Sequence, residues 1–341
     1  MMPKNECFVG IDTSNYTTSV AVSALDGQGK PAVVANIKYP LPVKAGERGL
    51  RQSDAVFAHV RNLPLAMDDL KEVLARDGYT VSAVGYSATP RDAQGSYMPC
   101  FLAGKVAASA LCAGLVKEGR SVPAYAFSHQ NGHIMAALYS SGALFQDSLM
   151  REPFLAFHVS GGTTEALLVK ARDGVCGFDV TLVGEGADLH AGQVIDRTGV
   201  MMGLDFPCGR AMEELAKGYL SECGQIKGIK VCVKDGTCHL SGLENIAERL
   251  WKETKDKAYV SAYVLSFVGK TIRRMTEQIQ EKREKPLPVV YAGGVMSNQL
   301  IRPMLSYKAG WQTYFCEPAY SADNAAGISL LCLMKAARCR E

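Results

Sequence analysis

The sequence lacks the features of membrane proteins and of disulfide-stabilised proteins. No apolar run reaches the roughly 18 residues that a membrane-spanning helix requires. The first strand-like segment, Cys7–Gly10, follows so closely on the first residue that we expect no signal peptide. The 11 cysteines include no C-x-x-C pair, which disfavours a zinc ribbon and a disulfide framework. These absences predict a cytoplasmic protein with reduced thiols and no membrane contact.

A strong excess of charge is also missing. The 37 basic and 34 acidic side chains give a formal net charge of +3, which permits contact with nucleic acid but does not require it. No low-complexity tract interrupts the chain. At 341 residues the chain is longer than one hydrophobic core usually organises, so we expect two domains.

Two segments share one pattern: an apolar strand, a turn rich in hydroxyl groups, and a second apolar strand. They cover residues 6–22 and 154–169 and begin about 150 residues apart. Helical periodicity follows each of them, and strands that alternate with helices are typical of α/β sheets covered by helices. The pattern predicts an internal duplication into two α/β lobes, with a soft boundary near residues 121–124.

His129 and His133 are four residues apart, so on a helix both imidazoles project from one face. Such a pair forms half of a transition-metal site, although one histidine could instead cap the helix while the other packs. Asp323 precedes a helix of small residues, where a helix-capping role is one interpretation. The other makes it the third ligand of a site with two histidines and a carboxylate, which suits iron or zinc.

Three further segments have the composition of nucleotide-binding turns. Ser160–Thr164 can surround phosphate oxygens with backbone N–H groups because glycine lets a ligand approach closely. Ser14–Thr18 fits this chemistry less well, since its turn contains no glycine. Gly293–Gly294, after an apolar strand, lets a base or ribose lie against the backbone, and Asn298 can offer its amide to the base. Each alone could be a tight turn, but together they favour a nucleotide.

The order of these motifs resembles the TsaD/Gcp family, the synthases of threonylcarbamoyladenosine in tRNA, formerly called O-sialoglycoprotein endopeptidases. The family's Gly-Ile-Glu-Thr-Ser, two-histidine, phosphate-loop, Ala-Gly-Gly-Val and Thr-Asp-Asn motifs have counterparts here in the same order. The segments that carry the resemblance are Gly10–Ser14, His129–His133, Val159–Gly162, Ala191–Gly192, Asp196–Arg197, Phe206–Gly209, Ser241–Leu243, Ala292–Asn298 and Asp323–Asn324.

The resemblance implies a two-lobed actin-like ATPase (ASKHA) fold with duplicated subdomains. It places an N-terminal lobe at 1–124, completed by a C-terminal helix at 325–341. The C-terminal lobe, 125–324, then carries the metal and nucleotide loops. The implied cofactors are one divalent iron or zinc ion on His129, His133 and Asp323, and an adenine nucleotide or acyl-adenylate. The implied nucleotide-binding residues are His158, Val159, Ser160, Gly161, Gly162, Asp196, Gly209, Gly293, Gly294 and Asn298.

Several family positions are changed in this chain, which therefore resembles a divergent paralogue. The family's Cys-Asp-Asp is Asn15-Tyr16-Thr17 here, and the histidine of its Ser-Gly-Gly-His is Thr163. The glutamate that faces the nucleotide is the neutral Gln193. The Gly-Pro-Gly-Leu turn is replaced by the longer Thr89–Tyr97. These substitutions predict weak or absent activity with the family's usual partners.

The resemblance implies transfer of a threonylcarbamoyl group from an acyl-adenylate to the exocyclic amine of a tRNA adenosine. tRNA and accessory proteins are the implied partners, with a homo- or heterodimer as the assembly. Carbamoyl transfer to another acceptor, or a nucleotide- and metal-binding partner without catalysis, are the alternatives. Metalloendopeptidase activity is disfavoured, because a zinc protease of this motif needs H-E-x-x-H and Gln130 stands in the place of the glutamate.

Overall fold

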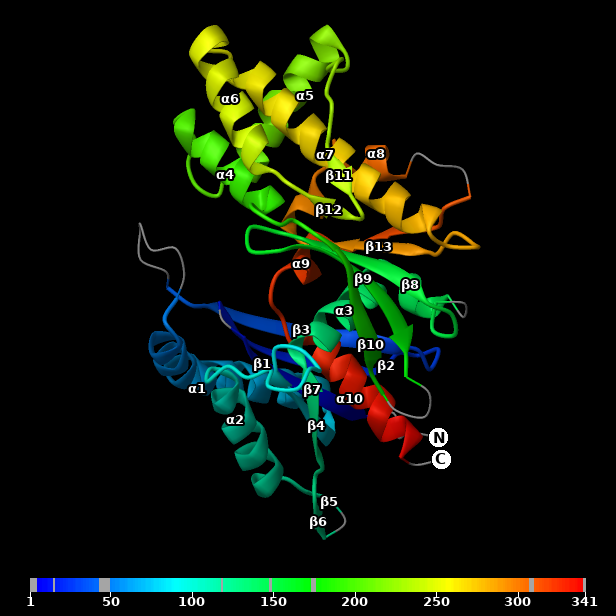
Figure 1. Cartoon of the computed structure of the whole chain (residues 1–341). Helices are drawn as coiled ribbons and strands as arrows, with labels where there is room; N and C mark the ends of the chain where they lie inside the picture. Colours follow the sequence, from blue (N-terminus) through cyan, green and yellow to red (C-terminus); the bar gives the residue numbers. More distant parts are fainter. Residues whose placement is uncertain are drawn as a thin grey trace. The chain divides into compact units, whose positions relative to one another are not determined.

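The computed structural model describes residues 5–14, 16–42, 50–117, 119–146, 149–172, 176–306 and 310–339 (Figure 1). The chain forms two compact units. The first contains residues 1–139, 171–179 and 322–341, and the second contains residues 140–170 and 180–321. Asn15, one of the changed family positions, lies outside the described residues.

A five-stranded sheet with the order β3-β2-β1-β4-β7 is the centre of the first unit. Its central strands are rich in β-branched and aromatic residues, which suit a pleated, buried surface. β1 pairs antiparallel with β2, while β1–β4 and β4–β7 are parallel. The strands are β1 (Glu6–Ser14), β2 (Thr17–Leu25), β3 (Pro31–Pro40), β4 (Thr80–Thr89) and β7 (Ala124–Ser128), with a two-stranded ribbon of β5 (Val116–Lys117) and β6 (Arg120–Ser121).

Helices cover both faces of this sheet. Val9 and Ile11 of β1 belong to the apolar core that includes α1 (Gln52–Asp77) and α2 (Phe101–Gly114). Gly10, between them, points to the opposite face, where a side chain on it would meet the backbone of α10 (Ala326–Arg338). Alternate residues of one strand therefore pack against different helices, as the period of a β-strand dictates.

The second unit is built around a sheet with the order β10-β9-β8-β13-β14. Its helices surround a core that includes Tyr291, Phe157 and Met212. The strands are β8 (Phe154–Val159), β9 (Thr164–Ala171), β10 (Phe178–Glu185), β13 (Val289–Ala292) and β14 (Thr313–Phe315), with a ribbon of β11 (Val233–Lys234) and β12 (Thr237–Cys238). The helices are α4 (Ala191–Met201), α5 (Gly209–Cys223), α6 (Ser241–Thr254), α7 (Lys257–Glu281), α8 (Arg302–Leu305) and α9 (Pro318–Ser321), with 3-10 turns η1 (Ala143–Phe145) and η2 (Gly294–Ser297).

The two sheets repeat one topology, as the paired hairpins of the sequence predict. In each sheet an antiparallel hairpin, β1–β2 or β8–β9, is extended by a third strand on one side. On the other side, two strands run parallel to the first strand of that hairpin. This repetition of an α/β subdomain is the duplicated architecture expected from the sequence.

The boundary between the two units does not lie at residue 124, where the sequence predicts it. β7, which begins at Ala124, pairs with β4 and so belongs to the first sheet. α3 (His129–Ser140) follows it directly, and the first unit extends to Tyr139. His129, His133 and Asp323 therefore lie in the first unit, together with the C-terminal helix, and not in the lobe that holds the glycine turns.

Among the described residues, no helix has the length and apolarity needed to span a membrane.

Candidate metal centre and nucleotide-binding turns

Both histidines lie on α3, and neither of them caps it. Ser128, the last residue of β7, accepts a hydrogen bond at Oγ from the backbone N–H of Asn131 (3.2 Å) and so acts as the cap. The rings of His129 and His133 lie on one side of the helix, with centroids 4.3 Å apart. The alternative in which one histidine serves as the helix cap is thus wrong, and both rings face the same side of α3.

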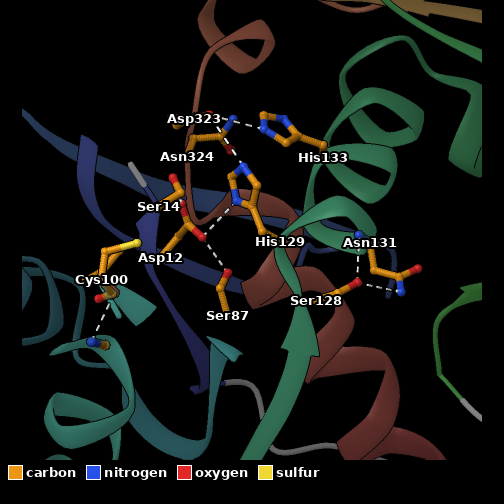
Figure 2. A network of polar contacts seen from close by, with 12 residues as sticks. Asp12, Ser14, Ser87, Cys100, Ser128, His129, Asn131, His133, Asp323 and Asn324 are labelled. Carbon is orange, nitrogen blue, oxygen red and sulfur yellow. Dashed lines mark hydrogen bonds and ion pairs between the residues drawn. The ribbon is translucent and has the colours of Figure 1, made fainter. Parts of the chain in front are cut away.

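Close packing of two glycines brings Asp323 to this pair. A Cβ built on Gly327 of α10 would lie 1.8 Å from the carbonyl oxygen of Gly132 in α3. The two helices can approach this closely only because side chains are absent at the crossing. At the start of α10, Asn324 Oδ1 accepts a hydrogen bond from the N–H of Ala326 (3.0 Å). Asp323 is therefore not needed as a cap, and its carboxylate faces the histidines (Figure 2).

The three side chains have the spacing of a metal site. Asp323 Oδ1 lies 3.2 Å from His133 Nε2 and 3.5 Å from His129 Nε2. The ligand atoms of all three lie within 4.8 Å of one another. Two atoms that are each ~2.1 Å from one ion lie ~3.4 Å apart at a tetrahedral angle. A single iron or zinc ion therefore fits this set, and the remaining coordination positions are available to a substrate oxygen.

A second carboxylate supports His129 from the opposite side. Asp12, at the end of β1, is fully buried and lies 3.0 Å from His129 Nδ1. Ser14 Oγ donates to Asp12 Oδ2 (2.6 Å), and Ser87 Oγ donates to Asp12 Oδ1 (Figure 2). A proton held on Nδ1 leaves the lone pair of His129 Nε2 free for a metal, which is the usual arrangement of a supporting carboxylate.

The electrostatics of this cluster favour a cation. Burial alone would lower the pKa of His129, but Asp12 and Asp323 outweigh it and raise that pKa to about 10. Burial would likewise raise the pKa of Asp323, yet its hydrogen bonds to His129 and His133 hold it well below its ordinary value. Two carboxylates thus converge on one imidazole, and a divalent ion would neutralise them in place of the imidazolium proton.

We expect Asp12→Asn to weaken zinc binding by about 10- to 100-fold, because the negative charge that supports His129 is lost while the shape of the side chain is kept. Competition against a chromophoric chelator measures the affinity. Asp68→Asn is the matched control, since Asp68 is an exposed carboxylate of the same unit. Equal zinc affinity in Asp12→Asn and the wild type would contradict the supporting role.

We also expect a pH dependence in the metal-free protein. The pKa of His129 rises from 6.5 to about 10 on folding, so its charged form stabilises the fold fully below pH 6.5. This contribution is lost as the pH rises through about 10. In EDTA, the difference in unfolding free energy between wild type and His129→Gln should therefore shrink over this range. A constant difference, measured by urea denaturation, would show that His129 is not a cation in the folded state.

The glycine turns meet at one edge of the second sheet. β8 and β13 are parallel neighbours that end at Val159 and Ala292, so the turns after them lie at the same edge. A Cβ on Gly293 would lie 2.2 Å from the carbonyl oxygen of Val159, and one on Gly192 would lie 2.6 Å from the backbone nitrogen of Gly161. These contacts pack η2 and the start of α4 against the phosphate-type turn. Ligands bind at such strand ends in open α/β sheets.

Four other glycines of this site have no packing reason to be glycine. Gly161, Gly162, Gly209 and Gly294 have nothing within 4 Å of a Cβ built on them, and none has a positive φ. A substrate that approaches the backbone closely would explain the absence of side chains. The predicted nucleotide site thus has room where a ligand needs it.

Asp196 and Asn298 use only part of their polar groups within the protein. Asp196 Oδ1 accepts from the N–H of Cys208 (2.8 Å), which holds the segment before α5, and burial raises the pKa of Asp196. Asn298 Oδ1 accepts from the N–H groups of Leu300 and Ile301. The structure gives Asn298 Nδ2 no partner among the described residues. The second Asp196 oxygen and this amide nitrogen suit a ribose and a base. His158 lies beside Ala292 in the strand register.

We expect Gly162→Val to weaken binding of ATP, ADP or AMP at least tenfold without reducing the unfolding free energy by more than about 0.5 kcal/mol, since the new side chain meets only open space. Calorimetry and urea denaturation measure the two quantities. Gly218→Val is the control, because Gly218 of α5 is equally open but lies outside the turns. Wild-type affinity in Gly162→Val would mean that the turn binds no phosphate.

Comparison with known families identifies the family of this chain. The family described as "TsaD: tRNA N6-adenosine threonylcarbamoyltransferase" matches residues 35–330. The chain belongs to the TsaD family. At the level of the family, this supports transferase chemistry in tRNA processing, as the motif order predicts.

Solved structures show the actin-like fold. Component A of (R)-2-hydroxyglutaryl-CoA dehydratase from Acidaminococcus fermentans superposes with a TM-score of 0.50 at 16% identity, over 97% of this chain and 99% of that one. The activator of 2-hydroxyisocaproyl-CoA dehydratase from Clostridium difficile, with bound ADPNP, has a TM-score of 0.47 at 11% identity, over 98% and 97% of the chains. The match to component A confirms the actin-like fold expected from the sequence.

One of the changed family positions, Gln193, has a structural role, and so has Asp188 in the same segment. Gln193 accepts a hydrogen bond at Oε1 from the N–H of His190 (3.1 Å) and so closes the first turn of α4. Asp188 accepts from the N–H of Leu240 and from Ser241 Oγ, which fixes the start of α6. Gln193 therefore caps a helix, besides removing the negative charge that the resemblance assigns to this position.

The sequence motifs alone assign no role to Asp12. Its role could have been suspected because its carboxylate directly follows the apolar strand segment Phe8–Ile11, where an unpaired charge is costly to bury.

Proposed function

We propose that this member of the TsaD family transfers a threonylcarbamoyl group from an acyl-adenylate to the exocyclic amine of a tRNA adenosine, with the help of a divalent iron or zinc ion. The observation that carries the proposal is the convergence of His129, His133 and Asp323, backed by Asp12, in a chain of this family. Such a site offers open positions to an acyl oxygen.

Each unit supplies one part of this chemistry. In the second unit the glycine turns, with Asp196 and Asn298, bind the adenylate through backbone N–H groups and the two free polar atoms. In the first unit the two histidines and Asp323 hold the metal. The bound metal would act as a Lewis acid that polarises and orients the carbamoyl oxygen.

The transfer is an acyl substitution. The adenosine amine forms a bond to the carbamoyl carbon, the bond from that carbon to the phosphate oxygen breaks, and AMP leaves. The amine loses one proton to solvent or to the departing phosphate. In this scheme much of the rate of transfer comes from holding the amine close to the acyl carbon in the orientation needed for attack.

The proposal includes partners. The family acts on tRNA, and we propose tRNA as the acceptor, accessory proteins of the family type, and a homo- or heterodimer as the assembly. We propose the cytoplasm as the site of action.

One observation favours a second candidate, which is carbamoyl transfer to another small acceptor. The substrate-facing polar groups that the resemblance implies are changed, with an exposed Tyr16 and a helix-capping Gln193, whereas the metal set is intact. A nucleotide- and metal-binding partner without catalysis would share these features.

Deletion and complementation in the source organism test the proposal. Mass spectrometry of tRNA nucleosides should show a loss of threonylcarbamoyladenosine, or of a related carbamoylated adenosine, when the protein is deleted. Wild-type protein should restore the nucleoside, and His133→Ala should not. An unchanged nucleoside profile after deletion would exclude a tRNA acceptor. It would favour the small-acceptor or non-catalytic candidates.

A further inference from the structure

The loop Pro90–Tyr97 begins against the metal-bearing helix α3, and the residues just after it return to that helix. At its start, the carbonyl oxygen of Pro90 accepts a hydrogen bond from the N–H of Gln130 (3.0 Å). Beyond its end, the ring of Phe101 lies 6.0 Å from the ring of His129. The loop thus spans a short stretch of surface beside the candidate metal centre, although no residue in it is a candidate ligand.

Asn131 clamps this loop. It lies between His129 and His133 in the sequence, is only 2% exposed, and uses both ends of its amide. Its Nδ2 donates to Asp92 Oδ2 (2.5 Å), and its Oδ1 accepts from the N–H of Phe178 (2.8 Å). One side chain of the metal helix therefore fixes two separate segments of the first unit, the loop and residues 176–179.

Charge reinforces the same anchor point. Arg172 donates to Asp92 Oδ2 (3.0 Å) and to Asp179 Oδ1 (2.7 Å). Asp92 is thus held from two sides, by an amide and by a guanidinium. A hydrogen bond to a charged group is roughly twice as strong as one between neutral groups, so the loop has a fixed attachment next to the metal helix.

The rest of the loop is organised internally and presents an aromatic side chain. The N–H of Ser96 donates to the carbonyl oxygen of Ala93 (3.0 Å), and Ser96 Oγ accepts from the N–H of Arg91 (3.0 Å). Tyr97 is 61% exposed. An exposed aromatic residue on an anchored loop beside a reactive centre is a typical recognition element.

We propose that Pro90–Tyr97 is the loop that recognises the acceptor, that Tyr97 stacks on a nucleobase of an RNA acceptor, and that Asn131 is the positioning residue that keeps the loop in register with the metal centre. A tyrosine ring binds any base through its face and is used for single-stranded or unstacked nucleotides. Only the naming of the acceptor as RNA rests on the proposed function.

Binding of an unmodified tRNA anticodon stem-loop, measured by fluorescence anisotropy, tests Tyr97. Tyr97→Ala should raise the dissociation constant about 10-fold, as expected for the loss of one stacked base. Tyr97→Phe should bind within twofold of wild type. The control is Phe57→Ala, which removes an equally exposed aromatic side chain from α1 of the same unit. Equal RNA affinity in Tyr97→Ala and wild type, or no RNA binding by wild type, would overturn the proposal.

A paired exchange tests the clamp. Asn131→Asp sets a carboxylate against Asp92 and should raise the KM for RNA, or its dissociation constant, at least fivefold, while adenylate affinity and zinc content stay unchanged. In the double variant Asn131→Asp, Asp92→Asn, the amide at position 92 can donate to the carboxylate at position 131. This variant should recover most of the lost RNA affinity. Failure of the double variant to recover RNA binding, with intact zinc content, would contradict the positioning role. RNA binding that depends on the loop in a protein without transferase activity would refute the proposed function and leave this inference standing.

Discussion

Gly327→Ala is expected to abolish metal binding and to lower the unfolding free energy by about 3 kcal/mol or more, the upper range for overpacking in a core. The new methyl group would lie 1.8 Å from the carbonyl oxygen of Gly132, which is backbone and cannot rotate away. α10 must move off α3, and Asp323, three residues before its first residue, moves with it. The ligand set would then lose the carboxylate that completes it.

Gly132→Ala is the matched control for the same helix crossing. Its Cβ would meet the end of the Ile328 side chain at 2.8 Å, and this side chain can change rotamer. The substitution should therefore cost about 1 kcal/mol and leave zinc binding within a few-fold of wild type. Zinc titration and urea denaturation compare the two variants. Zinc binding by Gly327→Ala at the level of the wild type would show that the crossing does not position Asp323.

The second large effect is expected from restoring the family's acidic groups. The triple variant Tyr16→Asp, Thr17→Asp, Gln193→Glu should raise the transfer rate about 100-fold, because charges placed where the reaction develops charge are worth several kcal/mol. Glutamate at 193 keeps the oxygen that accepts from the N–H of His190, so the cap on α4 survives. Tyr16 is 44% exposed, so a carboxylate at this position would remain in contact with water.

Thr17 needs a separate check, because it is only 9% exposed. The unfolding free energy of the single Thr17→Asp variant should be measured. The double variant Tyr16→Asp, Gln193→Glu should still show part of the increase in transfer rate. Gln193→Asn is the control, since it shortens the side chain without adding charge. No increase in rate in any of these variants would show that the neutral residues are not what limits transfer.

The duplicated fold could be predicted from the sequence because each strand pattern is local. Residues 6–22 and 154–169 carry the apolar alternation and the polar turn within themselves, and both form hairpins. The helices expected from the periodicity after each hairpin are also present, as α1 and α2 after the first and as α4, α5 and α7 after the second. α6 was not predicted, although the segment Ser241–Leu243 was singled out as a motif.

The parts of the site that could not be predicted depend on long-range contacts. His129 meets Asp12 across 117 residues, and Asn131 meets Asp92 through a loop whose pattern gives no sign of its destination. The boundary between the units also differs from expectation, since the pairing of β7 with β4 depends on the whole first sheet. The spacing of residues in the sequence reveals which side chains share one helix face. The order of the strands in the sheet decides which distant residues lie beside those side chains.

The most direct test of the proposed function supplies purified protein with zinc or iron, threonylcarbamoyl-AMP and unmodified tRNA, followed by mass spectrometry of the tRNA nucleosides. We predict slow formation of threonylcarbamoyladenosine by wild type, faster formation by the triple variant, and none by His133→Ala. Absence of the nucleoside with both wild type and the triple variant, while the adenylate binds tightly, would contradict the proposed transfer to tRNA.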